Sequence, residues 1–140
     1  MENKDSAILR LRTVSHNWLS ELEFMKDEQY FLEHLLSTHF IDLSTEKLYE
    51  PTRKLIRRLK DTEELGTDLI NDVHHFNHQI VSAVESHQEL VNSSVIKIHK
   101  EILKDFENYT LKFRYVKKKI FALIKEIMIH HKQKLLINKT

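Results

Sequence analysis

The chain has 140 residues, with 22 lysines and arginines against 21 acidic residues, one glycine, one proline and no cysteine. So few glycines and prolines exclude a strand-rich fold with many tight turns, as well as glycine-rich loops that bind phosphate. The net charge of +1 does not favour a polyanion-binding protein, and the lack of cysteine excludes disulfides and cysteine-ligated zinc.

A first helix is predicted from about residue 6 to about residue 40, with Asp5 or Ser6 as its N-cap. Its apolar residues recur at alternating spacings of three and four, which is the heptad pattern of a helix that packs along a partner. We call such a line of residues a seam. The first seam consists of Ile8, Leu11, Ser15, Trp18, Leu22, Met25, Gln29, Leu32, Leu36 and His39.

A turn is predicted at residues 41–46, and Ser44 or Thr45 would cap a second helix over about 45–91. Pro51 fits the first turns of this helix or its first position, where the missing N–H does no harm. The second seam consists of Leu55, Leu59, Thr62, Gly66, Leu69, Val73, Phe76, Ile80, Ala83 and His87.

Gly66 is the one place where the second helix could break. The seam keeps its register on both sides of the glycine, so we expect the helix to continue through it. With turns centred near residues 43 and 93, Gly66 would lie opposite Trp18 or Leu22 and close to Ile120. A missing side chain that makes room for the tryptophan would account for a glycine in mid-helix, with a hinge as the functional alternative.

The third helix, predicted over about 94–136 with Asn92 or Ser93 as its cap, carries the strongest seam. This seam consists of Val95, His99, Ile102, Phe106, Tyr109, Phe113, Val116, Ile120, Leu123, Ile127 and His130. Two short connections between three helices of similar length predict one all-α domain over residues 1–140. The expected architecture is an antiparallel up-down-up bundle of three long helices with coiled-coil-like packing.

Apolar residues also lie beside the seams, in greater number than three helices can cover. They include Phe24, Tyr30, Phe31 and Leu35 in the first helix, and the segment IFALIKEIMI (120–129) is apolar on almost every side. Wide cores that leave some aromatics half exposed are one interpretation. We expect instead that self-association, most simply as a twofold homodimer, completes the bundle. The residues predicted to form this interaction surface are Phe121, Ile124, Met128 and Ile129; another helical protein is the alternative partner.

Two basic stretches, RKLIRRLK (53–60) and KFRYVKKKI (112–120), fall in the same half of the predicted bundle as the acidic residues of the first helix. Charge balance within the bundle is therefore favoured over nucleic-acid binding, for which no reading motif is present. The longest apolar run, 120–124, is too short to span a bilayer. The first residues, MENKDSAILRLR, lack the apolar core of a signal peptide, so we expect a cytoplasmic location.

The stretch HHFNH, residues 74–78, contains the most conspicuous histidines. His74 and His78 have the spacing of a two-ligand metal clasp, but the register of the second seam turns His74, His75 and His78 away from the core. An exposed pair without carboxylate ligands or supporting hydrogen bonds binds a divalent ion only weakly. The pattern favours an exposed histidine cluster rather than a metal site.

Other histidines occupy seam positions. His87 and His99 lie at equal distances on either side of the second predicted turn and should face each other, while His130 should lie level with Gln29. We expect polar layers of Gln29, His87, His99 and His130 that fix the register of the helices. The alternative is a divalent-metal or pH-sensing site at His87 and His99, since two protonated imidazoles would repel each other near pH 6.

No cofactor is predicted, and nothing in the sequence indicates catalysis, because there is neither a nucleophile motif nor an inward acid pair. The sequence predicts a structural or protein-interaction bundle that self-associates through the apolar flank of its third helix. The alternative function is a metal-binding or pH-sensing bundle that uses the seam histidines.

Overall fold

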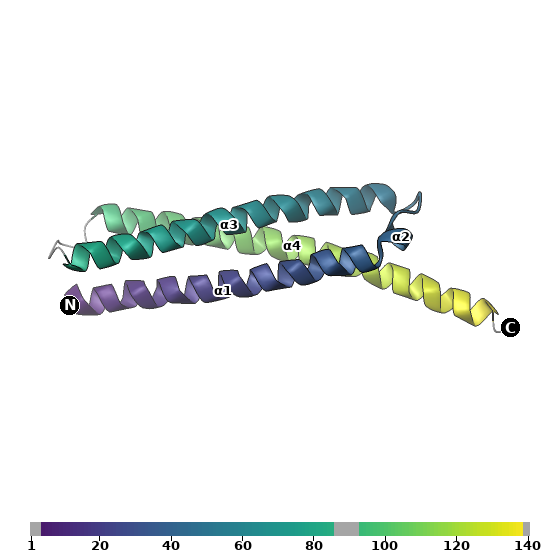
Figure 1. Cartoon of the computed structure of the whole chain (residues 1–140), viewed down its shortest axis with the longest axis horizontal. Helices are drawn as coiled ribbons and strands as arrows, with labels where there is room; N and C mark the ends of the chain where they lie inside the picture. Colours follow the sequence, from purple (N-terminus) through teal and green to yellow (C-terminus); the bar gives the residue numbers. More distant parts are fainter. Residues whose placement is uncertain (1–3, 86–92, 139–140) are drawn as a thin grey trace.

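The computed structural model describes residues 4–85 and 93–138, and every regular element in them is an α-helix. The helices are α1 (Lys4–Thr38), α2 (Phe40–Leu43), α3 (Tyr49–Glu85) and α4 (Ser93–Asn138). Figure 1 shows α3 running in the direction opposite to α1 and α4 and lying against both of them. The predicted all-α class is therefore confirmed. None of the described helices holds a stretch that is both long and apolar enough to cross a bilayer.

The connection after α1 differs from the predicted simple turn, because it contains the short helix α2. The backbone N–H of Leu43 donates to the carbonyl of His39 at 3.0 Å, and this extra turn places the Leu43 side chain in the core. The helix α3 consequently starts at Tyr49 rather than near residue 45, with Pro51 in its first turn. Residues 86–91 of the predicted second helix lie outside the described residues.

The core is built from the three predicted seams. Every member of the first seam from Ser15 to Leu36 is buried, including the polar residues Ser15 and Gln29. Heptad spacing produces this result because 3.5 residues per turn keep one line of side chains facing the neighbouring helices. The buried hydrophobic residues are Trp18, Leu22, Met25, Leu32, Leu36, Leu43, Leu55, Leu59, Leu69, Val73, Phe76, Ile80, Ile102, Tyr109, Phe113, Val116, Ile120, Ile124 and Ile127.

The helix α3 continues through Gly66. The close packing of a neighbouring side chain accounts for the glycine, and that side chain is Tyr109. A Cβ atom on Gly66 would lie 2.9 Å from the Tyr109 hydroxyl oxygen and 3.0 Å from two carbons of its ring. The prediction that Trp18 fills this space is wrong. The Trp18 ring packs instead on His99 and Phe106, with centroid separations of 4.8 and 6.3 Å.

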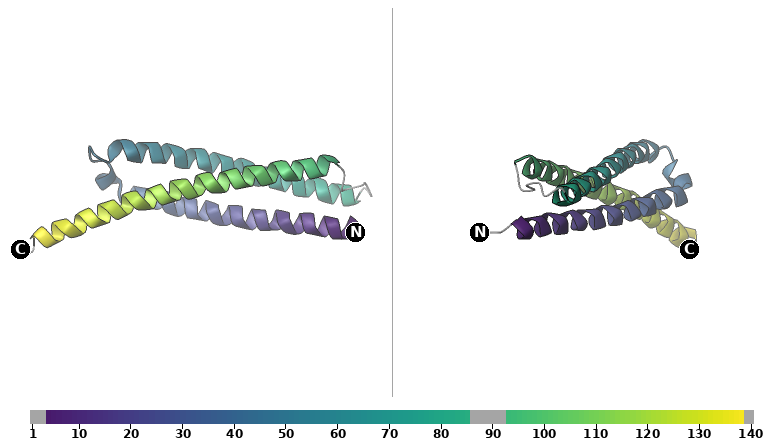
Figure 2. Two further views of the ribbon diagram at one scale, coloured as in Figure 1. Left: turned by 180° about the vertical axis from the view of Figure 1, so that it is seen from behind. Right: turned by 60° about the vertical axis from the view of Figure 1, so that its left-hand side comes forward.

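The register between α1 and α4 explains this difference. Lys117 of α4 pairs with Glu28 of α1, and His131 Nε2 lies 3.1 Å from Asp42 Oδ2 of α2. These pairs set α4 further along the bundle than a turn centred near residue 93 implies. The last turns of α4 therefore extend beyond the ends of α1 and α3, as Figures 1 and 2 show. We call residues 128–137 the α4 tail; all ten of them are exposed.

Candidate interaction surface

The predicted interaction surface on α4 is only partly exposed. Phe121, Met128 and Ile129 have exposed fractions of 42%, 61% and 47%, whereas Ile124 is 5% exposed and belongs to the core. Ile124 turns inward because it lies four residues after Ile120 and three before Ile127, both of which are buried. The assignment of Ile124 to the surface is therefore corrected.

Further apolar side chains extend this surface along the α4 tail. Leu135, Leu136 and Ile137 are each more than half exposed. Phe121, Met128 and Leu135 follow one another at seven-residue intervals, so they share one line of the helix, and Ile129 and Leu136 form a neighbouring line. A helix end with two exposed apolar lines is a surface that favours association.

A cleft lies at the base of the tail, where α4 passes α2 and the turn that follows it. Its volume is about 510 Å³, and its lining includes Leu48, Ile127 and Ile129. Polar contacts at its rim join the same elements: Lys47 Nζ lies 3.6 Å from Glu126 Oε1, and His131 Nε2 lies 3.1 Å from Asp42 Oδ2. Because these side chains are between about two fifths and nine tenths exposed, they orient the tail more than they stabilise the fold.

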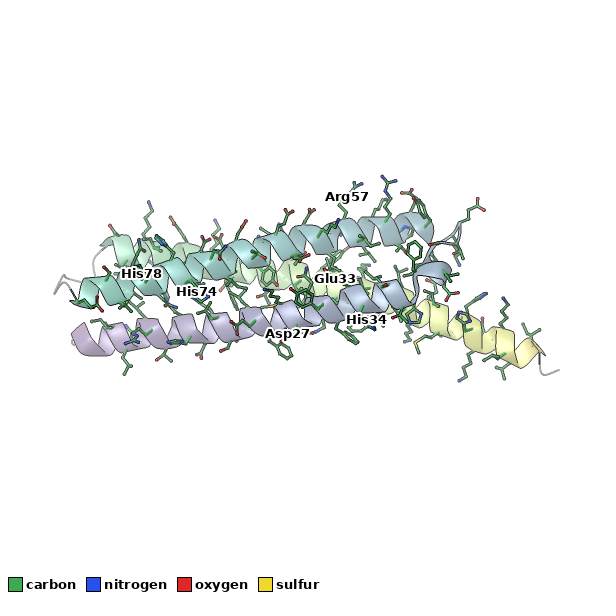
Figure 3. The ribbon with its side chains drawn as sticks, viewed as in Figure 1. Asp27, Glu33, His34, Arg57, His74 and His78 are labelled. Atoms are coloured by element: carbon green, nitrogen blue, oxygen red, sulfur yellow. The ribbon has the colours of Figure 1, made fainter. Side chains whose placement is uncertain are left out.

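A second exposed apolar surface lies on α1. Phe24 and Phe31 are 64% and 55% exposed, and their seven-residue spacing places both on one line of the helix. The exposed acidic residues Glu21, Glu23 and Asp27 lie in the same stretch, and Figure 3 shows Asp27 on the side of α1 that faces away from α3. The sequence places these phenylalanines beside the first seam, but it does not single them out as a site.

The exposed histidine cluster is positioned as the sequence indicates. His74, His75 and His78 are all exposed, and Figure 3 shows His74 and His78 along one stretch of α3. Within residues 4–85 and 93–138, no group of three or more histidine and acidic side chains is arranged to hold a metal ion.

His99 is the seam histidine with the most unusual surroundings. Its ring packs between Trp18 and Phe76, with centroid separations of 4.8 and 5.9 Å, and its Nε2 has no hydrogen-bond partner. Burial in this aromatic setting lowers the pKa of His99 below its ordinary value, because the charged imidazolium loses its hydration. The predicted partner of His99, His87, lies outside the described residues.

The predicted layer of His130 and Gln29 does not form. His130 is exposed and lines the cleft near Thr45 and Lys47, whereas Gln29 is buried and its amide donates to the carbonyl of Leu59 at 3.4 Å. The register of α4 is the reason, since it places Lys117 near this part of α1 and carries His130 past it.

The structure also contains an acid pair that the sequence pattern does not predict. Glu33 lies between α1 and α3 (Figure 3), and burial together with the neighbouring, hydrogen-bonded Glu63 raises its pKa. The two glutamates are far apart in the sequence and flank their seams, so no local motif predicts that they lie together. A third acidic or histidine ligand does not accompany them within the described ranges.

The basic stretches of α3 and α4 do lie side by side. The guanidinium of Arg58 and the ammonium of Lys119 approach the ring of Tyr115, at 5.1 and 5.5 Å from its centroid, while Lys117 pairs with Glu28. Two of these cations therefore stack on an aromatic ring and one is paired with a carboxylate.

Comparison with known proteins identifies no family model, no curated protein and no solved structure that matches the chain. The all-α fold and the exposed surfaces of α1 and α4 are therefore the observations on which a function rests.

Proposed function

We propose that this chain is a protein-interaction module: an antiparallel three-helix bundle with coiled-coil-like packing that forms a homodimer through the apolar flank of α4. The observation that carries the proposal is the run of exposed apolar side chains on α4, which includes Phe121, Met128 and Ile129 and continues into the α4 tail. Burying one such side chain fully contributes about 1.5–3 kcal/mol. Burying the exposed part of several such side chains contributes favourable free energy to a dimer, against the cost of association.

The bundle architecture in this proposal is supported by the burial of the heptad seams. Seam residues of α1, α3 and α4 make up nearly all of the buried hydrophobic core, and helices with this repeat pack knobs into holes at shallow crossing angles. A single bundle of three helices leaves the outer flanks of α1 and α4 open to water. A second copy is the simplest occupant, because a twofold axis covers the same surface on both chains.

The dimer is tested by measuring mass in solution with sedimentation equilibrium or light scattering. The wild-type chain should have twice the 16.8 kDa mass of one chain at micromolar concentrations, and the variant Met128→Glu/Ile129→Glu should be monomeric. Leu111→Glu is the control, because Leu111 is an apolar residue of the same helix, 67% exposed against 61% for Met128, and lies outside the proposed surface. It should remain dimeric. A wild-type chain that stays monomeric at these concentrations contradicts the proposal.

A second candidate function, a response to pH, is favoured by the surroundings of His99. The half-buried ring between Trp18 and Phe76 has a nitrogen without a partner, so its protonation in the folded state is opposed by the packing of the bundle. A stability that decreases below the ordinary histidine pKa of 6.5 in the wild-type chain, and decreases less in His99→Leu, would support this function.

A further inference from the structure

The exposed surface of α1 has the composition of a docking site for a helix that carries a line of apolar side chains flanked by basic ones. We call Glu21, Glu23, Phe24, Asp27 and Phe31 the α1 face; all five side chains are exposed. The two aromatic rings supply apolar area on one line of the helix, and three carboxylates surround them. Two large exposed rings on one line of a helix, with polar residues around them, have the composition of an interaction surface.

The α4 tail has the complementary composition. It contains Lys132 and Lys134 together with His130 and His131, and it has no acidic residue. Its Met128 and Leu135 are spaced seven residues apart, as Phe24 and Phe31 are on the α1 face. Two helices with matching heptad spacing can interdigitate these side chains along a shared line.

The tail cannot reach the α1 face of its own chain. Lys117 is level with Glu28, so Met128 lies eight residues, or about 12 Å at 1.5 Å per residue, beyond the level of Phe31. Because α4 is one continuous helix to Asn138, the tail points away from its own α1, as Figure 2 shows. The two complementary surfaces can therefore meet only between copies.

We propose that the α4 tail of one copy binds the α1 face of a second copy, and that the second copy returns the same contact. This inference rests on the homodimer proposed above and specifies how the dimer is built. When each copy places its tail on the face of the other, a twofold axis relates the two contacts. Both tails and both faces are then covered in a dimer. Opposite charges across the contact strengthen and orient it.

Charge also decides against the competing arrangement, in which the two tails pair with each other. Lys125 and Lys132 flank the apolar line of the tail, and an antiparallel pair of tails would bring the lysines of one copy toward those of the other. Like charges in such a position are unfavourable. The α1 face offers three carboxylates instead, and of the two basic residues that line the groove beside Glu21 and Phe24, Arg114 and Lys117, the second is paired with Glu28.

Charge reversal provides the test, with two variants studied alone and mixed. The face variant carries Glu23→Lys and Asp27→Lys, and the tail variant carries Lys132→Glu and Lys134→Glu. Each variant alone would oppose like charges at both contacts, so we expect its dimer dissociation constant to rise at least about tenfold. The equimolar mixture should form a heterodimer as tight as the wild-type dimer, because both contacts then join opposite charges.

Sedimentation velocity measures the three samples, and circular dichroism verifies that each variant remains helical. The matched control is Glu64→Lys/Asp68→Lys, which makes the same change at exposed positions of α3 and should dimerise as the wild type does. A face variant that dimerises normally, or a mixture that remains monomeric, overturns the tail-to-face contact. In that case a wild-type dimer that Met128→Glu/Ile129→Glu disrupts still supports self-association, whereas a monomeric wild type removes both proposals.

Discussion

Replacing Gly66 with alanine tests whether the close contact between α3 and α4 requires a glycine at this position. In an exposed helix, glycine to alanine stabilises the folded chain by about 1 kcal/mol, since alanine has the higher helix propensity. Here the added Cβ would lie 2.9 Å from the hydroxyl oxygen of Tyr109 and 3.0 Å from two carbons of its ring. These separations are several tenths of an ångström shorter than a van der Waals contact.

The Tyr109 ring has little freedom to move away, because the residue is only 2% exposed and its ring packs against Phe113 with a centroid separation of 6.1 Å. Overpacking a tight core costs about 1–3 kcal/mol. After the gain in helix propensity is subtracted, Gly66→Ala should lower the free energy of unfolding by about 1 kcal/mol. The thermal midpoint should fall by about 3 °C.

A double-mutant cycle with Tyr109→Leu separates the two effects. Leucine at position 109 removes the ring atoms that the new Cβ would meet, so Gly66→Ala should become stabilising in that background. Urea unfolding followed by circular dichroism gives the four free energies. The packing argument is refuted if Gly66→Ala stabilises the wild-type chain, or if its effect is the same in both backgrounds.

Two further predictions concern buried polar atoms. The Ser15 hydroxyl is fully buried without a hydrogen-bond partner, so Ser15→Ala should raise the free energy of unfolding by about 1 kcal/mol; a loss of stability in urea would show that the hydroxyl is satisfied. Burial lowers the pKa of His99, so the unfolded chain binds a proton first as the pH drops below the ordinary value of 6.5. Stability should therefore be complete above that pH and decrease below it. Between about pH 8 and about pH 5, the urea midpoint of His99→Leu should fall less than that of the wild-type chain. Identical pH profiles for the two chains would contradict the assignment of this pH dependence to His99.

The seams were predictable because burial repeats with the heptad. Residues such as Leu22 and Phe113 are identified by spacing alone, and the core contains both. The relative register of the helices was not predictable in the same way, since sliding one seam by a heptad along another preserves apolar contact. Only residues that interrupt the apolar repeat, such as Gly66, fix the relative register of the helices. From the sequence alone, a pairing of Gly66 with Tyr109 cannot be distinguished from a pairing with Trp18.

The same ambiguity accounts for the errors at the candidate site. The expected position of His130 beside Gln29 followed from the wrong register, and Ile124 was assigned to the surface because the segment 120–129 is apolar on nearly every side. A pattern without a polar face does not indicate how much of the helix its neighbours cover. The spacing of Phe24 and Phe31 around Asp27 is visible in the sequence, but only the structure shows that both rings are more than half exposed.

The projecting end of α4 has a consequence for local stability. Apart from the contact of His131 with Asp42, its side chains are largely exposed, and a helical end with few tertiary contacts opens at little cost in free energy. Amide protons of residues 128–137 should therefore exchange with solvent far faster than those beside Phe113 whenever a chain is alone. The exchange rate of each of those amides therefore reports whether a second chain covers the tail. The protection of these amides should rise with protein concentration only if another chain shields the helix.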